Sequence, residues 1–219
     1  MSKPRTDAKG RASERLKGAY ELATPEDNRA YYQGFADDYD DGFAAALGYA
    51  FPPAIARAYR AVAGDADIPV ADIGCGTGLV AAALGLPADR IDGMDISPDM
   101  LAKARAKGLY RALIEVDLTG DITHLAARYG AVLSAGTFTH GHLGPEPLVK
   151  LLGIARSGGL FVIGVNGQHY VAQDFDAVLE PLLNDGVIRN VAVENVRIYD
   201  KAGHEHSEDT ALILTFRKC

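Results

Sequence analysis

Three glycines at alternating positions, Gly74, Gly76 and Gly78, directly follow the short apolar run Val70–Ile73. Glycine has no Cβ, so such a turn can adopt positive φ and let a ligand approach the backbone closely. The helix expected after the turn offers free N–H groups at its first residues. We therefore predict that the three glycines bind a cofactor and that Cys75, between them, contributes backbone contacts only.

The spacing of these glycines distinguishes between two cofactor classes. A dinucleotide fingerprint, G-x-G-x-x-G, needs its third glycine at position 79, where this chain has Leu79. Asp72 precedes the first glycine by two positions. A carboxylate there suits a ligand with an ammonium group, such as the amino-acid end of S-adenosylmethionine, and suits a pyrophosphate poorly. The turn therefore favours S-adenosylmethionine over a nicotinamide dinucleotide.

Two further carboxylates end the next expected strands. Asp95 lies 17 residues beyond Gly78, where a Rossmann-type sheet places a carboxylate that accepts both ribose hydroxyls. Asp117 is expected to accept a hydrogen bond from the exocyclic amine of adenine, although it could instead cap a following helix.

Three apolar residues complete the predicted cofactor site. Ile96 is expected to contact the cofactor, Met100 to turn under the adenine ring, and Leu118 to cover the face of that ring. All of these positions follow carboxyl ends of expected parallel strands, which is the usual ligand edge of such a sheet.

The segments Asp72–Gly78, Asp95–Met100 and Val116–Leu118 together resemble the class I S-adenosylmethionine-dependent methyltransferases. The resemblance extends over about residues 69–165. It implies S-adenosylmethionine as cofactor and a Rossmann-like α/β fold with a seven-stranded sheet, helices on both faces and the last strand antiparallel.

Two flanking segments narrow the resemblance. Tyr32–Asp40 is similar to an aromatic-x-x-x-Ala-x-x-Tyr-Asp signature of small-molecule methyltransferases, which implies Tyr32 and Tyr39 as lid residues over the cofactor. Tyr39 is also a catalytic candidate, although both tyrosines could simply pack a helix. Leu133–His142 resembles the branch that contains the Williams–Beuren-region methyltransferase-like proteins.

His140 is the second catalytic candidate. It follows the fourth expected strand at its carboxyl end, and a neutral imidazole can accept a proton at physiological pH. We predict that His140, rather than His142, faces the methyl acceptor, with a hydrogen bond to the loop backbone as the alternative. The pair His140/His142 has no nearby carboxylate at ligand spacing, and the pair His204/His206 lies among polar residues at an expected hairpin tip, so we expect no metal.

Short apolar runs alternate with helical patterns from residue 69 onward, which predicts a parallel sheet covered by helices. We expect a helical cap over residues 1–60, including a helix over 25–38 and one that starts near 53, and an S-adenosylmethionine-binding domain over 61–219. The expected strands cover 69–73, 90–95, 110–116, 130–134 and 159–165, followed by a hairpin of 187–199 and 209–217. The expected helices of the domain lie near 78–84, 98–106, 121–128, 145–155 and 171–184.

The charge and the apolar composition of the chain indicate which classes of partner it can bind. The net charge is −7, with 22 basic and 29 acidic residues, which disfavours nucleic acid. No signal peptide and no apolar run of about 20 residues is evident, which predicts a cytoplasmic protein without a membrane partner. We therefore expect a methyltransferase that modifies an O, N, S or C atom of a small-molecule acceptor. A nicotinamide-dependent oxidoreductase and a non-catalytic S-adenosylmethionine-binding protein are the alternatives, and the oligomeric state stays open.

Overall fold

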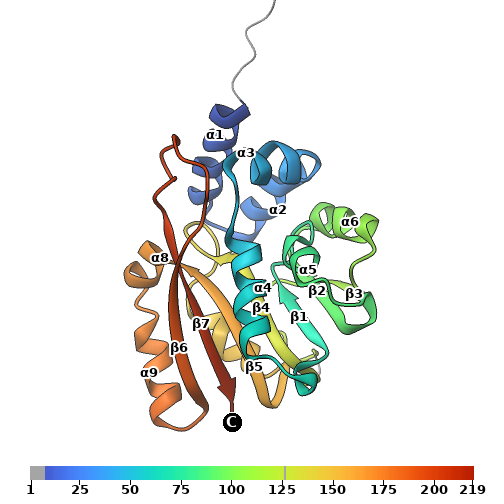
Figure 1. The fold of residues 1–219 in the computed structure, drawn as a ribbon, viewed down its shortest axis with the longest axis vertical. Coiled ribbons are helices and arrows are strands. Elements are labelled where there is room, and N and C mark those ends of the chain that lie inside the picture. Colours follow the sequence, from blue (N-terminus) through green and yellow to red (C-terminus); the bar gives the residue numbers. More distant parts are fainter. Residues whose placement is uncertain (1–7, 126) are drawn as a thin grey trace, which may run out of the picture.

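Seven strands form one mixed sheet in the order β3-β2-β1-β4-β5-β7-β6 (Figure 1). The computed structural model describes residues 8–125 and 127–219. Strands β1 to β5 are parallel, and β7 runs antiparallel to both of its neighbours. The predicted antiparallel last strand is thus confirmed. The strands are β1 (Val70–Ile73), β2 (Ile91–Asp95), β3 (Ala112–Glu115), β4 (Tyr129–Phe138), β5 (Ala155–Asn166), β6 (Ile188–Arg197) and β7 (Thr210–Lys218).

Helices cover both faces of the sheet, as predicted, because neighbouring residues of the buried strands point to opposite sides. Leu160 and Val162 of β5 face a core with α4 (Phe51–Val62) and α5 (Leu79–Leu84). Phe161 and Ile163 face a second core with α7 (Glu146–Leu152) and α9 (Asp176–Asn184). Helix α6 (Pro98–Lys107) lies beside β2 and β3.

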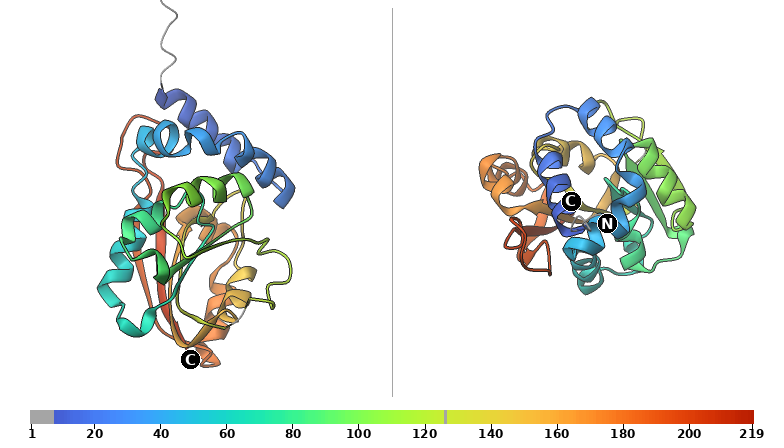
Figure 2. Two further views of the ribbon diagram at one scale, coloured as in Figure 1. Left: turned by 90° about the vertical axis from the view of Figure 1, so that its right-hand side faces the viewer. Right: turned by 90° about the horizontal axis from the view of Figure 1, so that it is seen from above.

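The N-terminal helices form a cap above the carboxyl ends of the parallel strands (Figures 1 and 2). Helix α2 begins as predicted, because Thr24 Oγ1 accepts a hydrogen bond from the N–H of Asp27 and Asp27 accepts one from the N–H of Thr24. The helix expected over 25–38 ends early, at Gly34, a poor helix former. The cap comprises α1 (Ala8–Tyr20), α2 (Pro25–Gln33), a 3₁₀ turn (Ala36–Asp38), a π-helix (Tyr39–Ala44) and α3 (Ala45–Leu47).

Two helix predictions for the α/β domain were wrong. The described residues of 121–128 form turns, because Asp121 Oδ1 accepts a hydrogen bond at 2.8 Å from the N–H of Thr123, a local bond that competes with helix formation. The helix expected over 171–184 is divided into α8 (Gly167–Ala172) and α9. Asp174 lies between them with φ +49°, which an α-helix does not allow.

The packing of α4 on the sheet depends on a glycine in β5. Phe51, the first residue of α4, is 2% exposed, and its ring lies against Gly164. A Cβ at position 164 would lie 2.3 Å from Cζ of Phe51, closer than real Cβ contacts allow. The absent side chain therefore sets how closely this helix approaches the sheet.

Gly164→Ala should lower the free energy of unfolding by about 1–3 kcal/mol, the usual cost of overpacking a core. Phe51→Leu should recover part of that loss in the double variant, because it removes the clashing atoms. Urea denaturation measures both effects. Gly34→Ala is the control, since a Cβ there meets nothing within 4 Å; equal stability of Gly164→Ala and the parent would contradict the packing argument.

Candidate functional site

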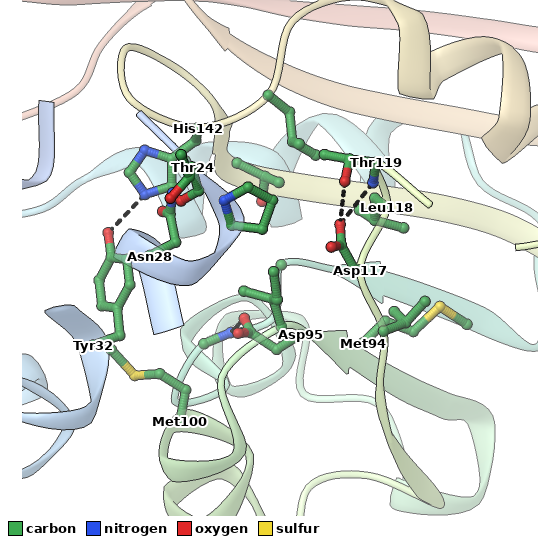
Figure 3. A pocket seen from close by; sticks show the side chains of 18 of the residues that line it. Thr24, Asn28, Tyr32, Met94, Asp95, Met100, Asp117, Leu118, Thr119 and His142 are labelled. Atoms are coloured by element: carbon green, nitrogen blue, oxygen red, sulfur yellow. Dashed lines mark hydrogen bonds between the residues drawn. The ribbon is translucent and has the colours of Figure 1, made fainter. Parts of the chain in front are cut away.

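A cavity of about 200 Å³ lies at the carboxyl edge of the sheet, under the cap (Figure 3). Its wall comes from the glycine turn after β1, the ends of β2, β3 and β4, the start of α6, and α2 with the residues before it. The cavity-lining residues include the following predicted cofactor or lid residues: Gly74, Gly76, Asp95, Ile96, Met100, Asp117, Leu118, Tyr32 and Tyr39. The structure therefore brings together most of the predicted site.

The glycine turn is shaped by close backbone approach. Gly74 has φ +61°, and a Cβ there would lie 1.9 Å from Oγ1 of Thr137. Gly76 has φ +52°, and a Cβ there would meet nothing within 4 Å. The turn therefore packs against β4 at Gly74 and presents bare backbone at Gly76. Gly78 and the buried Cys75 do not line the cavity.

Asp95 joins the glycine turn to the end of β2. One carboxylate oxygen accepts a hydrogen bond from the N–H of Gly76 at 2.8 Å, and the other accepts one from the N–H of Ser97 at 2.9 Å. Burial raises the pKa of Asp95, and these backbone donors oppose the shift. Each carboxylate oxygen has a second lone pair, so Asp95 can still accept hydroxyl groups from a ligand in the cavity.

Asp117 closes a local turn instead of capping a helix. Its Oδ1 accepts hydrogen bonds from the N–H of Thr119 at 2.9 Å and from the hydroxyl of Thr119 at 2.7 Å (Figure 3). No helix follows among the described residues up to β4. The helix-capping alternative is therefore wrong, and the carboxylate lines the cavity beside Leu118.

Asp72 lies outside the cavity wall. Its side chain is fully buried, and Oδ2 accepts a hydrogen bond from the Tyr110 hydroxyl at 2.7 Å. Oδ1 is buried without a hydrogen-bond partner among the described residues. Burial raises the pKa of Asp72 to about 7, the Tyr110 hydroxyl opposes this shift, and the Asp95 carboxylate reinforces it. Contact between Asp72 and a ligand ammonium group stays a prediction.

The two histidines after β4 lie differently from the sequence prediction. His142, not His140, lines the cavity. Nε2 of His142 lies 2.9 Å from the Tyr32 hydroxyl (Figure 3). Nδ1 of His142 lies 2.9 Å from the carbonyl oxygen of His140. The His140 ring packs instead against Tyr20 and His169, at centroid distances of 5.4 and 5.1 Å. The turn after β4 directs His140 into this ring cluster.

Sequence reasoning missed the contacts that attach the cap. Asn28 donates hydrogen bonds at 3.0 Å to the carbonyl oxygens of Thr24 and Gly141, which joins α2 to the loop after β4. Asp40 accepts a hydrogen bond from the Thr77 hydroxyl and pairs with Lys107. The predicted capping box marked the neighbourhood of Asn28, but no local pattern indicated either partner.

A second cavity, of about 50 Å³, lies between the cap and the sheet. We call it the aromatic chamber, because eight Phe and Tyr rings contribute to its wall, together with the imidazole of His142. Tyr32, Tyr39, Gly136 and His142 line both cavities, so the chamber adjoins the first cavity at these residues.

Residues 8–125 and 127–219 show neither a metal-ligand cluster nor a membrane-spanning helix. No three His, Cys, Asp or Glu side chains in this part of the chain gather in a group that could hold a metal ion. The described helices include none with the length and apolar composition of a membrane span.

Comparison with known proteins identifies the family of this chain. Residues 70–157 match the family described as "Methyltransferase domain". The human methyltransferase-like protein 27 is 32% identical over 149 residues, which are 67% of this chain and 60% of that protein. This chain belongs to the class I S-adenosylmethionine-dependent methyltransferases. The aligned part spans about three fifths of the length of this human relative.

Solved structures support the fold assignment. An S-adenosylmethionine-dependent methyltransferase of Thermotoga maritima, described as a possible histamine N-methyltransferase, has a TM-score of 0.56 and 15% identity; the match covers 87% of this chain and 97% of that one. A TehB-like S-adenosylmethionine-dependent methyltransferase of Corynebacterium glutamicum has a TM-score of 0.54 and 21% identity, over 90% and 100% of the two chains. The family match over residues 70–157, in turn, favours methyl transfer over the nicotinamide-dependent oxidoreductase that was the alternative.

S-adenosylmethionine is the cosubstrate of this family, and the charges of the first cavity fit it. The described wall holds two carboxylates, Asp95 and Asp117, and no Lys or Arg, while Arg29 of α2 lies outside the wall with its guanidinium 3.8 Å from Asp117 Oδ2. Such a wall attracts a ligand with sulfonium and ammonium charges and repels a pyrophosphate.

Asp95→Ala should weaken binding of S-adenosylhomocysteine at least tenfold, because two hydrogen bonds to a charged acceptor contribute about 1.5–3 kcal/mol each. Asp95→Asn, which keeps one acceptor oxygen, should lose less. Isothermal titration calorimetry measures both affinities. Asp99→Ala, on the first turn of α6 but outside the cavity wall, is the control. Unchanged affinity of a folded Asp95→Ala variant would reject the ribose assignment.

Asp72→Asn should stabilise the ligand-free protein more at pH 8 than at pH 5. The folded-state pKa of about 7 exceeds the ordinary value of 3.8, so the unfolded chain releases this proton first and the folded state loses stability as pH rises between these values. The cost grows by at most about 1.4 kcal/mol per pH unit. Denaturant unfolding at both pH values measures it, with the exposed Asp89→Asn as control. An equal effect at pH 5 and pH 8 would contradict the raised pKa.

Proposed function

We propose that this protein transfers the methyl group of S-adenosylmethionine to a small molecule. The observation that carries the proposal is the junction of two cavities of opposite character. One has carboxylates and bare glycine backbone, which fit the cofactor, and the other is the aromatic chamber beneath the cap. A methyl group that leaves the cofactor towards the chamber passes Tyr32, Tyr39 and His142.

In this proposal each residue of the first cavity binds a different part of the cofactor. Asp95 accepts hydrogen bonds from the ribose hydroxyls, and Asp117 accepts one from the exocyclic amine of adenine. Met100 and Leu118 enclose the adenine ring. The Gly76 backbone leaves room for the amino-acid end. The bound cofactor supplies an electrophilic methyl group. The protein contributes orientation of the acceptor and exclusion of water, which are the main sources of rate in such a transfer.

Tyr39 and the histidines after β4 are the candidates for the acceptor side. Tyr39 lines both cavities, which supports its proposed place beside the reacting groups. His142, which lines both cavities, has the position that the sequence predicted for His140, so we propose His142 as the histidine nearest to the acceptor.

A small molecule fits this arrangement better than a macromolecule. The chamber lies between the cap and the core and has a volume of about 50 Å³, enough for a few water molecules or one small reacting group. The net charge of −7 also disfavours an RNA or DNA backbone as the bound acceptor.

The test supplies S-adenosylmethionine with a labelled methyl group and, separately, three pools of acceptors: small metabolites, RNA and proteins. We expect label in the small-molecule pool and its loss with Asp95→Ala. Label in RNA or protein alone would contradict the acceptor class. Binding of S-adenosylhomocysteine without methyl transfer to any pool would instead favour a non-catalytic binding protein.

A further inference from the structure

The aromatic chamber has no formal charge in its wall. The described residues that line it include no Asp, Glu, Lys or Arg, and its polar side chains are tyrosines, Thr139, Asn166 and His142. A charged group transferred from water into such surroundings loses solvation without gaining an ion pair, which is strongly unfavourable. Aromatic walls instead favour planar rings, through edge-to-face and offset stacking. The chamber therefore selects an uncharged, planar ligand.

The hydrogen bonds of His142 determine its tautomer. The carbonyl oxygen of His140 can only accept, so Nδ1 of His142, 2.9 Å away, carries the hydrogen. In the neutral ring Nε2 then has a lone pair, and the Tyr32 hydroxyl, 2.9 Å away, donates to it. The Tyr32 oxygen keeps two lone pairs that can accept a proton from another group.

Tyr32 and His142 both lie where the two cavities meet. A group in the chamber can thus contact the Tyr32 oxygen on one side and the cofactor on the other. The position of the pair matches that of a proton acceptor for the nucleophile.

We propose that a small, uncharged aromatic acceptor binds at the junction of the two cavities, with only part of its ring in the chamber and its O–H or N–H nucleophile facing Tyr32, and that Tyr32 and His142 together accept its proton. This inference rests on the proposed function, and it adds the acceptor class and the proton path.

The proposed step conserves atoms and electrons. The acceptor O or N forms a bond to the methyl carbon as the methyl–sulfur bond breaks, and the sulfur keeps that electron pair. The acceptor proton moves to the Tyr32 oxygen, and the Tyr32 proton moves to Nε2 of His142. The products are the methylated acceptor, S-adenosylhomocysteine and a protonated His142, which returns its proton to water after product release.

The surroundings keep His142 neutral before the step. Burial lowers the pKa of His142, the hydrogen bond to the carbonyl of His140 opposes this shift, and His169 reinforces it. Besides the Asp95 carboxylate in the wall of the first cavity, the titratable groups around it include Tyr32 of α2, Tyr39 of the π-helix and His169 of α8. Burial raises the pKa of both tyrosines and lowers the pKa of His169, so all three are neutral at pH 7. The rate should therefore decline only below pH 6.5.

The first experiment needs neither cofactor nor acceptor. In the ligand-free protein labelled with ¹⁵N-histidine, His142 should show the Nδ1–H tautomer, identified by the signal lost in His142→Gln. Tyr32→Phe should shift the Nε2 signal, whereas Tyr31→Phe should not, since the Tyr31 hydroxyl donates to the carbonyl of Arg15. An Nε2–H tautomer in the parent protein would overturn the proton path.

The second experiment measures turnover with the acceptor found in the small-molecule pool. Tyr32→Phe and His142→Gln should lower kcat by about 10²- to 10⁴-fold. Tyr31→Phe and the exposed His124→Gln should match the parent. Binding of S-adenosylhomocysteine should change by less than about threefold in all four variants, which shows that the site is folded. A kcat of Tyr32→Phe within about threefold of the parent would overturn the proton path.

The acceptor class is tested with phenols, imidazoles and indoles against carboxylates, thiols and alkylammonium compounds. Preference for the first group supports the inference. Preference for a charged acceptor would overturn it while leaving methyl transfer intact. Absence of both cofactor binding and methyl transfer in the parent protein would reject the proposed function itself, which separates the two failures.

Discussion

The contact between the Asp95 carboxylate and the N–H of Gly76 holds the cofactor edge of the sheet together. Strands β1 and β2 are parallel neighbours, with Ile73 opposite Met94, so the residues after each strand must meet at one edge. The carboxylate then bridges the glycine turn and the start of α6 through two backbone donors. A side chain of another type would leave those N–H groups without this acceptor. The same interaction that shapes the turn thus presents the acidic wall to the cavity.

The cap is attached to this edge by two kinds of interaction of very different strength. Its acidic residues Asp37 and Asp40 pair with Lys103 and Lys107 of α6, but these side chains are 30–89% exposed. Exposed ion pairs contribute little, and salt screens them. Burial of Phe35 and Phe43, each 4% exposed, contributes more. The charges therefore orient the cap, whereas the aromatic packing holds it over the chamber.

The two cavities divide the chemical requirements of the site. A sulfonium cofactor needs carboxylates, and a neutral acceptor needs a wall without fixed charge. In the proposed arrangement the ends of β2 and β3 hold the cofactor, whereas the cap and the start of α4 contribute most of the aromatic wall on the acceptor side. Only the boundary residues contribute to both cavities, and these include the one histidine of the chamber wall.

Local patterns in the sequence determined the sheet, the glycine turn, the start of α2 and the carboxylate at the end of β2, because each depends on residues close together in the chain. The helix predicted over 121–128 does not form, because the Asp121 side chain accepts a hydrogen bond from the backbone N–H of Thr123 and so competes with helical hydrogen bonds. The choice between His140 and His142 needed the tertiary structure. Tyr32 and His142 are 110 positions apart, and Asp40 and Thr77 are 37 apart. No periodicity or spacing encodes such pairs, because they exist only when the cap packs on the strand ends and desolvates the side chains between them.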